Sequence, residues 1–226
     1  MKFPLLYFMF LIFGTCLGQS SQMDLKSYFS ESEIKDLNLI TDFFQSELCG
    51  SSNQAKFSKC LTKSLPEYTE LIQNYIGNKV SYRKQKKLYR TISSKTFNKI
   101  WGLCQNTLLI IEPNYEHTSI CFSGNSLFID FTKDLGENNR YLKYYGEKFE
   151  NVGSFDSGTF LTMDIMQNPT EWDLDNRNVQ IFLAIHYLTQ NDEMNRDKKV
   201  KRLMKRYDRK LNKNQKKTVP NNGYSK

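Results

Sequence analysis

Alanine is almost missing from this chain of 226 residues, with only Ala55 and Ala184 present. Because alanine is the strongest helix former, helices must be predicted here from apolar periodicity and capping residues. Histidine is equally scarce, with two residues, and neither stands in an H-x-x-x-H or H-E-x-x-H arrangement that would place zinc ligands on one helix face. No catalytic or ligand-binding motif stands out, and we expect no metal or cofactor.

Long apolar runs are also lacking, with one exception at the N-terminus, and this excludes a polytopic membrane protein. The exception, Phe3–Phe13, follows a lysine and precedes several small residues, which is typical of a secretory signal peptide cleaved before Gln19. Two alternatives are a lipoprotein signal, in which Cys16 is lipidated, and a retained anchor helix. We expect residues 1–18 to be removed and the protein to be exported, to the periplasm or the extracellular space.

Four cysteines follow the predicted signal peptide, and an even count in an exported chain favours disulfides. Three connectivities are possible. Pairing Cys49 with Cys60 and Cys104 with Cys121 closes the shortest loops, and each bridge would add roughly 3 kcal/mol. The alternative is four buried free thiols that pack as small apolar groups.

Helical patterns dominate the first part of the chain. Ser30 and Glu33 form a capping box before an apolar periodicity that ends at Gly50. Asn53 can cap a second helix, and Pro66 suits the first turn of a third. The basic run 81–90 is only weakly amphipathic and predicts a solvated helix or loop.

The middle of the chain contains the only β-like pattern. Ser94 can cap a helix that continues through Leu103. The short runs 107–111 and 118–122 then lie on either side of a Pro113-Asn114 turn, which predicts a small hairpin.

Four further helices are predicted over 127–135, 138–151, 157–167 and 177–190. The last is apolar almost all round, which is typical of a central core helix. The fold class is therefore mainly α: one domain of about seven helices with one small antiparallel hairpin.

The two histidines favour structural roles. His186 lies inside the apolar helix and is interpreted as a core histidine with satisfied hydrogen bonds. His117, on a predicted turn with Glu112, could serve as a base for a Cys121 nucleophile, but a disulfide at Cys121 would leave no thiolate.

Oxygen-bearing side chains gather just before the core helix, namely Asp173, Asp175, Asn176 and Asn178. Their alternation resembles a calcium loop, but the turn glycine and terminal glutamate of an EF-hand are missing. Asx-turn and N-cap chemistry explains the same residues.

Charge is distributed very unevenly. The segment from Asp192 onward holds thirteen lysines and arginines against four acidic residues, so the rest of the chain carries a net −1. An apolar stripe recurs at helical spacing there: Val200, Leu203, Met204, Tyr207 and Leu211. Basic residues occupy the remaining faces: Lys198, Lys199, Arg202, Lys205, Arg206, Arg209 and Lys210.

This pattern predicts a basic amphipathic helix over 192–217, after a helical domain over 19–191 and before a disordered end over 218–226. The helix either docks on the domain as a solvated structural element or binds an anionic surface, such as envelope lipid or an acidic polymer. Nucleic acid is not expected as a partner, because an exported protein rarely meets it and no recognition fold is visible.

One resemblance adds to these patterns. The run Asn168–Val179 leading into Ala184–Asp192, together with a signal ending before Gln19, resembles exported proteins of AT-rich bacteria of the Bacteroidota type. No known activity comes with this resemblance, so it assigns no functional residues.

The sequence thus favours an exported, non-enzymatic module that binds an anionic surface or partner through its basic C-terminal helix. The alternative is a secreted hydrolase whose site is assembled from scattered carboxylates. A deep pocket with converging, perturbed carboxylates would favour the hydrolase.

Overall fold

The computed structural model describes residues 23–50, 56–69, 79–109, 113–123, 127–152 and 158–218. This part of the chain holds nine α-helices and one two-stranded antiparallel sheet, so the predicted mainly α class with a small hairpin is confirmed. In chain order the elements are α1 (Glu31–Cys49), α2 (Phe57–Thr69), α3 (Tyr82–Thr91), α4 (Ser94–Ile100), β1 (Trp101–Leu108), β2 (Tyr115–Phe122), α5 (Leu127–Leu135), α6 (Arg140–Val152), α7 (Gly158–Gln167), α8 (Arg177–Arg196) and α9 (Lys198–Thr218).

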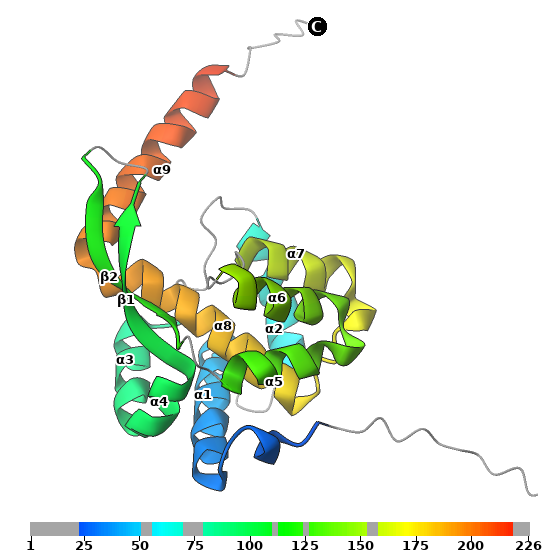
Figure 1. Cartoon of the computed structure of the whole chain (residues 1–226). Coiled ribbons are helices and arrows are strands. Elements are labelled where there is room, and N and C mark those ends of the chain that lie inside the picture. The colour runs from blue at the N-terminus through cyan, green and yellow to red at the C-terminus, as the bar shows by residue number, and fades with distance from the viewer. Residues whose placement is uncertain are drawn as a thin grey trace, which may run out of the picture.

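Helix α8 is the centre of the molecule, as its apolar sequence predicts. It crosses the middle of the fold and contacts α1, α3, α5, α7 and β2 (Figure 1). Every residue from Asn178 to Thr189 is buried. It extends to Arg196, which is beyond the predicted end at residue 190.

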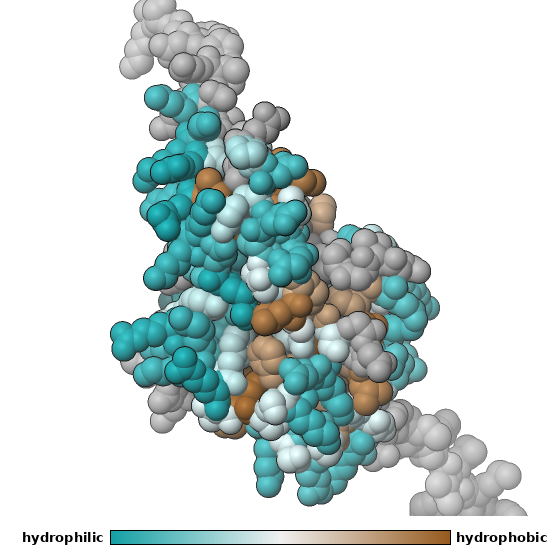
Figure 2. Space-filling view, turned by 60° about the vertical axis from the view of Figure 1, so that its left-hand side comes forward, coloured by the Kyte–Doolittle hydropathy of each residue, from teal (hydrophilic) through white to brown (hydrophobic). Residues whose placement is uncertain are grey.

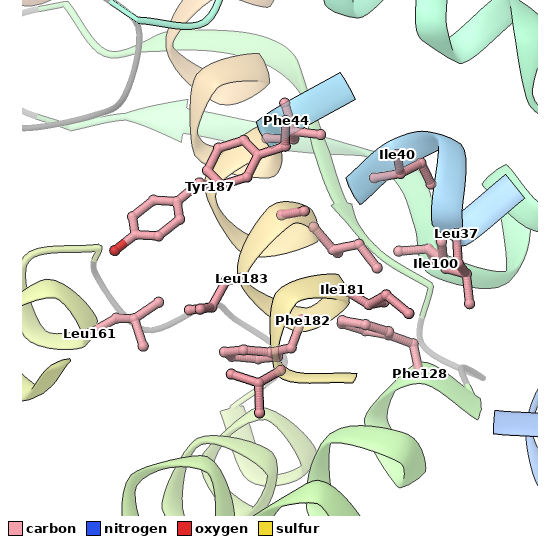
Figure 3. Close-up of a cluster of buried hydrophobic side chains, with 14 of the residues drawn as sticks. Leu37, Ile40, Phe44, Ile100, Phe128, Leu161, Ile181, Phe182, Leu183 and Tyr187 are labelled. Carbon is pink, nitrogen blue, oxygen red and sulfur yellow. The ribbon is translucent and has the colours of Figure 1, made fainter. Parts of the chain in front are cut away.

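Aromatic and aliphatic side chains from several helices converge on α8 (Figure 3). Tyr187 stacks on Phe44 of α1 with ring centroids 5.8 Å apart, and Leu161 of α7 lies on the other side. Phe182 meets Tyr145 of α6 edge to face at 5.0 Å. These contacts join the N-terminal and C-terminal halves of the domain in one core.

Helix α1 begins where the capping box predicts. The Ser30 hydroxyl accepts a hydrogen bond from the Glu33 amide, and the Ser30 amide donates 2.7 Å to a Glu33 carboxylate oxygen. The Lys99 ammonium of α4 forms an ion pair with Glu33, with Nζ 2.9 Å from Oε2. Burial acts to raise the pKa of Glu33, but the Ser30 amide and Lys99 outweigh it and lower the pKa to about 2.

Three predicted helix boundaries are wrong. Pro66 lies inside α2, after the buried Leu61 and Leu65, and does not begin a third helix. The helix capped near Ser94 ends at Ile100 and does not reach Leu103. Its N-cap is Ser93, one residue earlier than predicted.

Trp101 begins strand β1 where helical periodicity predicts a continuing helix. Its indole N–H donates 2.8 Å to the Thr189 hydroxyl of α8, and its side chain is buried. The strand then pairs with β2 from Trp101 opposite Phe122 to Leu108 opposite Tyr115. The hairpin is therefore longer than predicted, and His117 lies within β2, not on a turn.

Both predicted disulfides are present. The Cα atoms of Cys49 and Cys60 are 5.3 Å apart, and the bridge joins the end of α1 to α2. Those of Cys104 and Cys121 are 5.9 Å apart and link the two strands. The pairs are compatible with an exported protein in an oxidising environment.

Several predictions lie outside the described residues: the signal peptide over 1–18, the Asn53 cap, the apolar residues over 71–76, Glu112, and most of the end over 218–226. In the part of the chain that is described, no helix has the length and apolar character needed to cross a membrane.

Candidate functional site

The basic helix α9 begins at a single capping residue. Asp197 separates α9 from α8, and its Oδ1 accepts hydrogen bonds from the amides of Lys199 at 2.6 Å and Val200 at 3.2 Å. Burial acts to raise the pKa of Asp197, but these amides and the Tyr115 hydroxyl outweigh it and lower the pKa below its usual value. The basic helix begins at Lys198, six residues later than the predicted boundary at 192.

The hairpin holds the first turn of α9. Tyr115 of β2 donates a hydrogen bond of 3.0 Å from its hydroxyl to Asp197 Oδ2. The Lys199 ammonium lies 4.0 Å from the centroid of the same ring, a cation–π contact. One strand residue therefore contacts both the cap and a basic side chain of the helix.

Buried polar groups anchor the end of α8 just before α9. Arg196 forms two hydrogen bonds, of 2.5 and 2.9 Å, with the fully buried Asp192. The Asn191 side chain donates a hydrogen bond of 2.6 Å to Gln85 Oε1 of α3. Gln85 in turn donates one of 2.7 Å to the carbonyl of Leu188. This network fixes α3 against α8 and so fixes the point from which α9 extends.

The apolar stripe of α9 packs only in part. Val200 is buried, and Leu203, Met204 and Tyr207 are half-buried. The side chain of Leu211 lies outside the description. Beyond its first turns α9 projects away from the helical body, beside the hairpin (Figure 1).

All six residues predicted to bind an anionic surface are exposed: Lys198, Lys199, Arg202, Lys205, Arg206 and Arg209. Lys201, Lys210 and Lys213 are exposed as well. None of these nine forms an ion pair with a carboxylate among the side chains that the structure describes. Figure 2, turned to bring this side forward, shows hydrophilic residues over its left and upper parts and hydrophobic residues gathered in the middle and on the right.

The structure adds a second basic element that sequence reasoning did not include in the site. Helix α3 exposes Arg83, Lys84, Lys86, Lys87 and Arg90, while its Gln85 and Leu88 are buried. A signal was present: residues 79–109 contain eight lysines and arginines and no acidic residue. The net charge of residues 1–191 is nearly neutral, because acidic residues elsewhere in that part of the chain offset this basic segment.

Carboxylates gather on another part of the molecule. A cleft of about 630 Å³ is lined by Asp134, Glu137, Glu171, Asp173 and Asp175, with Arg177 and Asn178 among the other lining residues. All five acidic side chains are exposed. The cleft therefore does not combine its carboxylates with the burial that a general-acid site uses, and it does not support the hydrolase alternative.

The calcium-like run caps α8 and makes contacts with distant segments of the chain. Asn176 caps α8, because its Oδ1 accepts a hydrogen bond of 2.9 Å from the Asn178 amide. Asp175 accepts a hydrogen bond of 2.8 Å from the Ser58 hydroxyl. Asn178 donates 2.9 Å to the carbonyl of Met23. Within the described residues no group of three or more histidine, cysteine or acidic side chains is arranged to hold a metal ion.

His186 is a core histidine, as predicted. Its Nδ1 lies 2.8 Å from the Tyr145 hydroxyl and its Nε2 lies 3.0 Å from Gln190 Nε2, and the residue is fully buried. Cys121, the hypothetical nucleophile, is bonded to Cys104 and carries no thiolate.

Comparisons with protein-family models, curated proteins and solved structures find no match to this chain. The resemblance to exported Bacteroidota proteins therefore stays a prediction.

Proposed function

We propose that the protein is an exported, non-enzymatic module that binds an anionic surface or partner through the basic face of α9. One observation carries the proposal: nine basic side chains of α9 are exposed, and among the described side chains no carboxylate neutralises them. Unpaired cations on one helix attract anionic groups and lose that attraction in salt.

The position of α9 supports this role. A structural helix would bury its full apolar stripe on the body, whereas only Val200 of this stripe is fully buried among the described side chains. The cap at Asp197 and the Tyr115 contacts fix the base of the helix and leave its basic face accessible. Apart from Lys199, which contacts the Tyr115 ring, and Lys201, which donates a hydrogen bond to Asn195, the described basic side chains take no part in holding the helix.

Export belongs to the same proposal. The signal-like N-terminus and the two disulfides support delivery to the periplasm or the extracellular space, with lipid attachment at Cys16 as the alternative. In either location the partner that we propose is an anionic lipid surface or an acidic polymer.

Charge reversal tests the proposal directly. The fourfold variant Lys199→Glu, Arg202→Glu, Arg206→Glu and Arg209→Glu is compared with wild type for binding to vesicles of phosphatidylglycerol and phosphatidylcholine and to heparin. The control variant Lys35→Glu, Lys59→Glu, Lys63→Glu and Lys143→Glu makes the same change in net charge at exposed residues of α1, α2 and α6.

We expect the α9 variant to lose binding and the control to retain most of it. Equal loss in both variants would indicate a non-specific effect of net charge, and unchanged binding in the α9 variant would overturn the proposal. Circular dichroism of both variants verifies that the helices persist.

A further inference from the structure

The acid-free segment 79–109 gives the molecule a second cationic row. On α3 the basic residues span an arc of about 160° on the side opposite the buried Gln85 and Leu88. Only Lys84 has a carboxylate partner among the described side chains, Glu47 at 2.8 Å. Of the remaining four, Lys86 lies over the Tyr82 ring, and Arg83, Lys87 and Arg90 are available to a ligand.

The two basic helices meet at one corner of the fold. Tyr82, the first residue of α3, is hydrogen-bonded to Asp192, which pairs with Arg196 at the end of α8. Burial first, and then the charge of Asp192, raise the pKa of Tyr82 to about 12. Lys198, the first residue of α9, follows Arg196 by two positions. From this corner α3 and α9 run in different directions along the same edge of the molecule (Figure 1).

The two helices that carry these rows follow one another along this edge of the molecule (Figure 1). The ten residues of α3 span about 15 Å, and α9 from Lys198 to Lys213 spans about 24 Å. On α9 the basic residues cover an arc of about 180°, opposite the apolar stripe. A flat surface can touch only part of so wide an arc, whereas a flexible chain of anionic groups can follow it around the bend.

The apolar stripe also argues against membrane insertion. An interfacial helix buries its apolar face in the headgroup region. Here Val200 is buried in the protein, and Leu203, Met204 and Tyr207 are half-buried. The protein thus covers part of the described stripe, and the exposed charges of α9 are the main means of attachment.

We propose that the partner is a linear acidic polymer, such as an acidic polysaccharide, which lies along both α9 and α3. This inference rests on the proposed function and deepens it by naming the class of partner and a second contact. The exposed residues Arg83, Lys87 and Arg90 of α3 would bind the polymer's sulfate, phosphate or carboxylate groups together with those of α9.

The test changes α3 alone and leaves α9 intact. The variant Arg83→Glu, Lys87→Glu and Arg90→Glu is compared with a control, Lys35→Glu, Lys63→Glu and Lys143→Glu, which makes the same net-charge change on α1, α2 and α6. The full-length proteins are titrated with heparin at several salt concentrations, and with vesicles of phosphatidylglycerol and phosphatidylcholine. Circular dichroism and unfolding midpoints check that both variants fold.

We expect the α3 variant to bind heparin about tenfold to a hundredfold more weakly than the control at low salt. Its salt dependence should also be shallower, because fewer counterions are displaced. Equal heparin affinity in the α3 variant and the control would overturn this inference. The proposed function would still stand in that case if the fourfold α9 variant failed to bind heparin. Tight binding to vesicles with none to heparin would also overturn it, by identifying a lipid surface as the partner.

Discussion

Tyr115 on β2 and Asp197 at the start of α9 are joined by a hydrogen bond of 3.0 Å across 82 residues of sequence. Asp197 also caps α9 through the amides of Lys199 and Val200. The strand residue therefore stabilises the cap on which the orientation of the basic helix depends. The hairpin positions the candidate binding helix in this way.

Removing the Tyr115 hydroxyl should loosen the base of α9. The variant Tyr115→Phe keeps the ring under Lys199 but loses the hydrogen bond to Asp197, so it should weaken the cap of α9. Hydrogen exchange should show faster exchange in the first turns of α9 and no change in α1. The control Tyr144→Phe alters an exposed tyrosine of α6. If exchange in α9 is the same in both variants, Tyr115 does not hold the helix.

Glu193 should make the protein less stable as the pH rises. Burial, and then the charge of Asp192, raise its pKa from 4.5 to about 7. The folded state therefore binds more protons than the unfolded state between pH 4.5 and 7, and stability falls as the pH rises through that window.

The variant Glu193→Gln removes this dependence. It should be more stable than wild type by about 1 to 3 kcal/mol at pH 8 and nearly equal to it at pH 4. Urea unfolding at the two pH values measures the difference. The exposed Glu171→Gln serves as the control and should show little change at either pH. Stabilisation of Glu193→Gln by the same amount at pH 4 would contradict the assignment to a titrating carboxyl.

The hairpin disulfide should contribute measurably to stability. The double variant Cys104→Ser and Cys121→Ser leaves no single thiol and should lower the free energy of unfolding by about 3 kcal/mol. Denaturant unfolding of wild type with and without a reducing agent provides the comparison. A double variant as stable as oxidised wild type would show that packing alone holds the two strands.

Export has a direct chemical readout. Mass spectrometry of the mature protein should show a start at Gln19, which can cyclise to pyroglutamate. A lipid-modified start at Cys16 would identify a lipoprotein. An intact Met1 would contradict both forms of processing.

Much of the fold could be predicted because its signals are local. The capping box at Ser30 and the nearly all-apolar run of α8 each lie within one helix. Periodicity predicted α5, α6 and α7 closely for the same reason. The short loops between paired cysteines likewise favoured the observed disulfides.

Trp101 and Pro66 show where local signals fail. The helical spacing around Trp101 is overridden by pairing with β2 and by the bond to Thr189, which lies 88 residues away. Pro66 is a good first residue for a helix, yet it lies inside α2, whose packing begins earlier with the buried Leu61 and Leu65.

Only the α9 part of the candidate site could be predicted from the sequence. The basic face of α9 could be predicted because it lies on one helix. The contribution of α3 depends on the network of Gln85, Asn191 and Asp192, which brings two distant segments to one corner. No spacing in the sequence reports that proximity.

The salt dependence of binding tests the central claim most directly. The affinity of the full chain for heparin is measured from low ionic strength to well above 0.1 M, where the screening length is about 10 Å. The account predicts a steep, continuous fall in the heparin affinity of wild type as the salt concentration rises. It also predicts that the fourfold α9 variant does not bind heparin even at low salt. Binding that is unchanged both by salt and by deletion of residues 198–226 would contradict it.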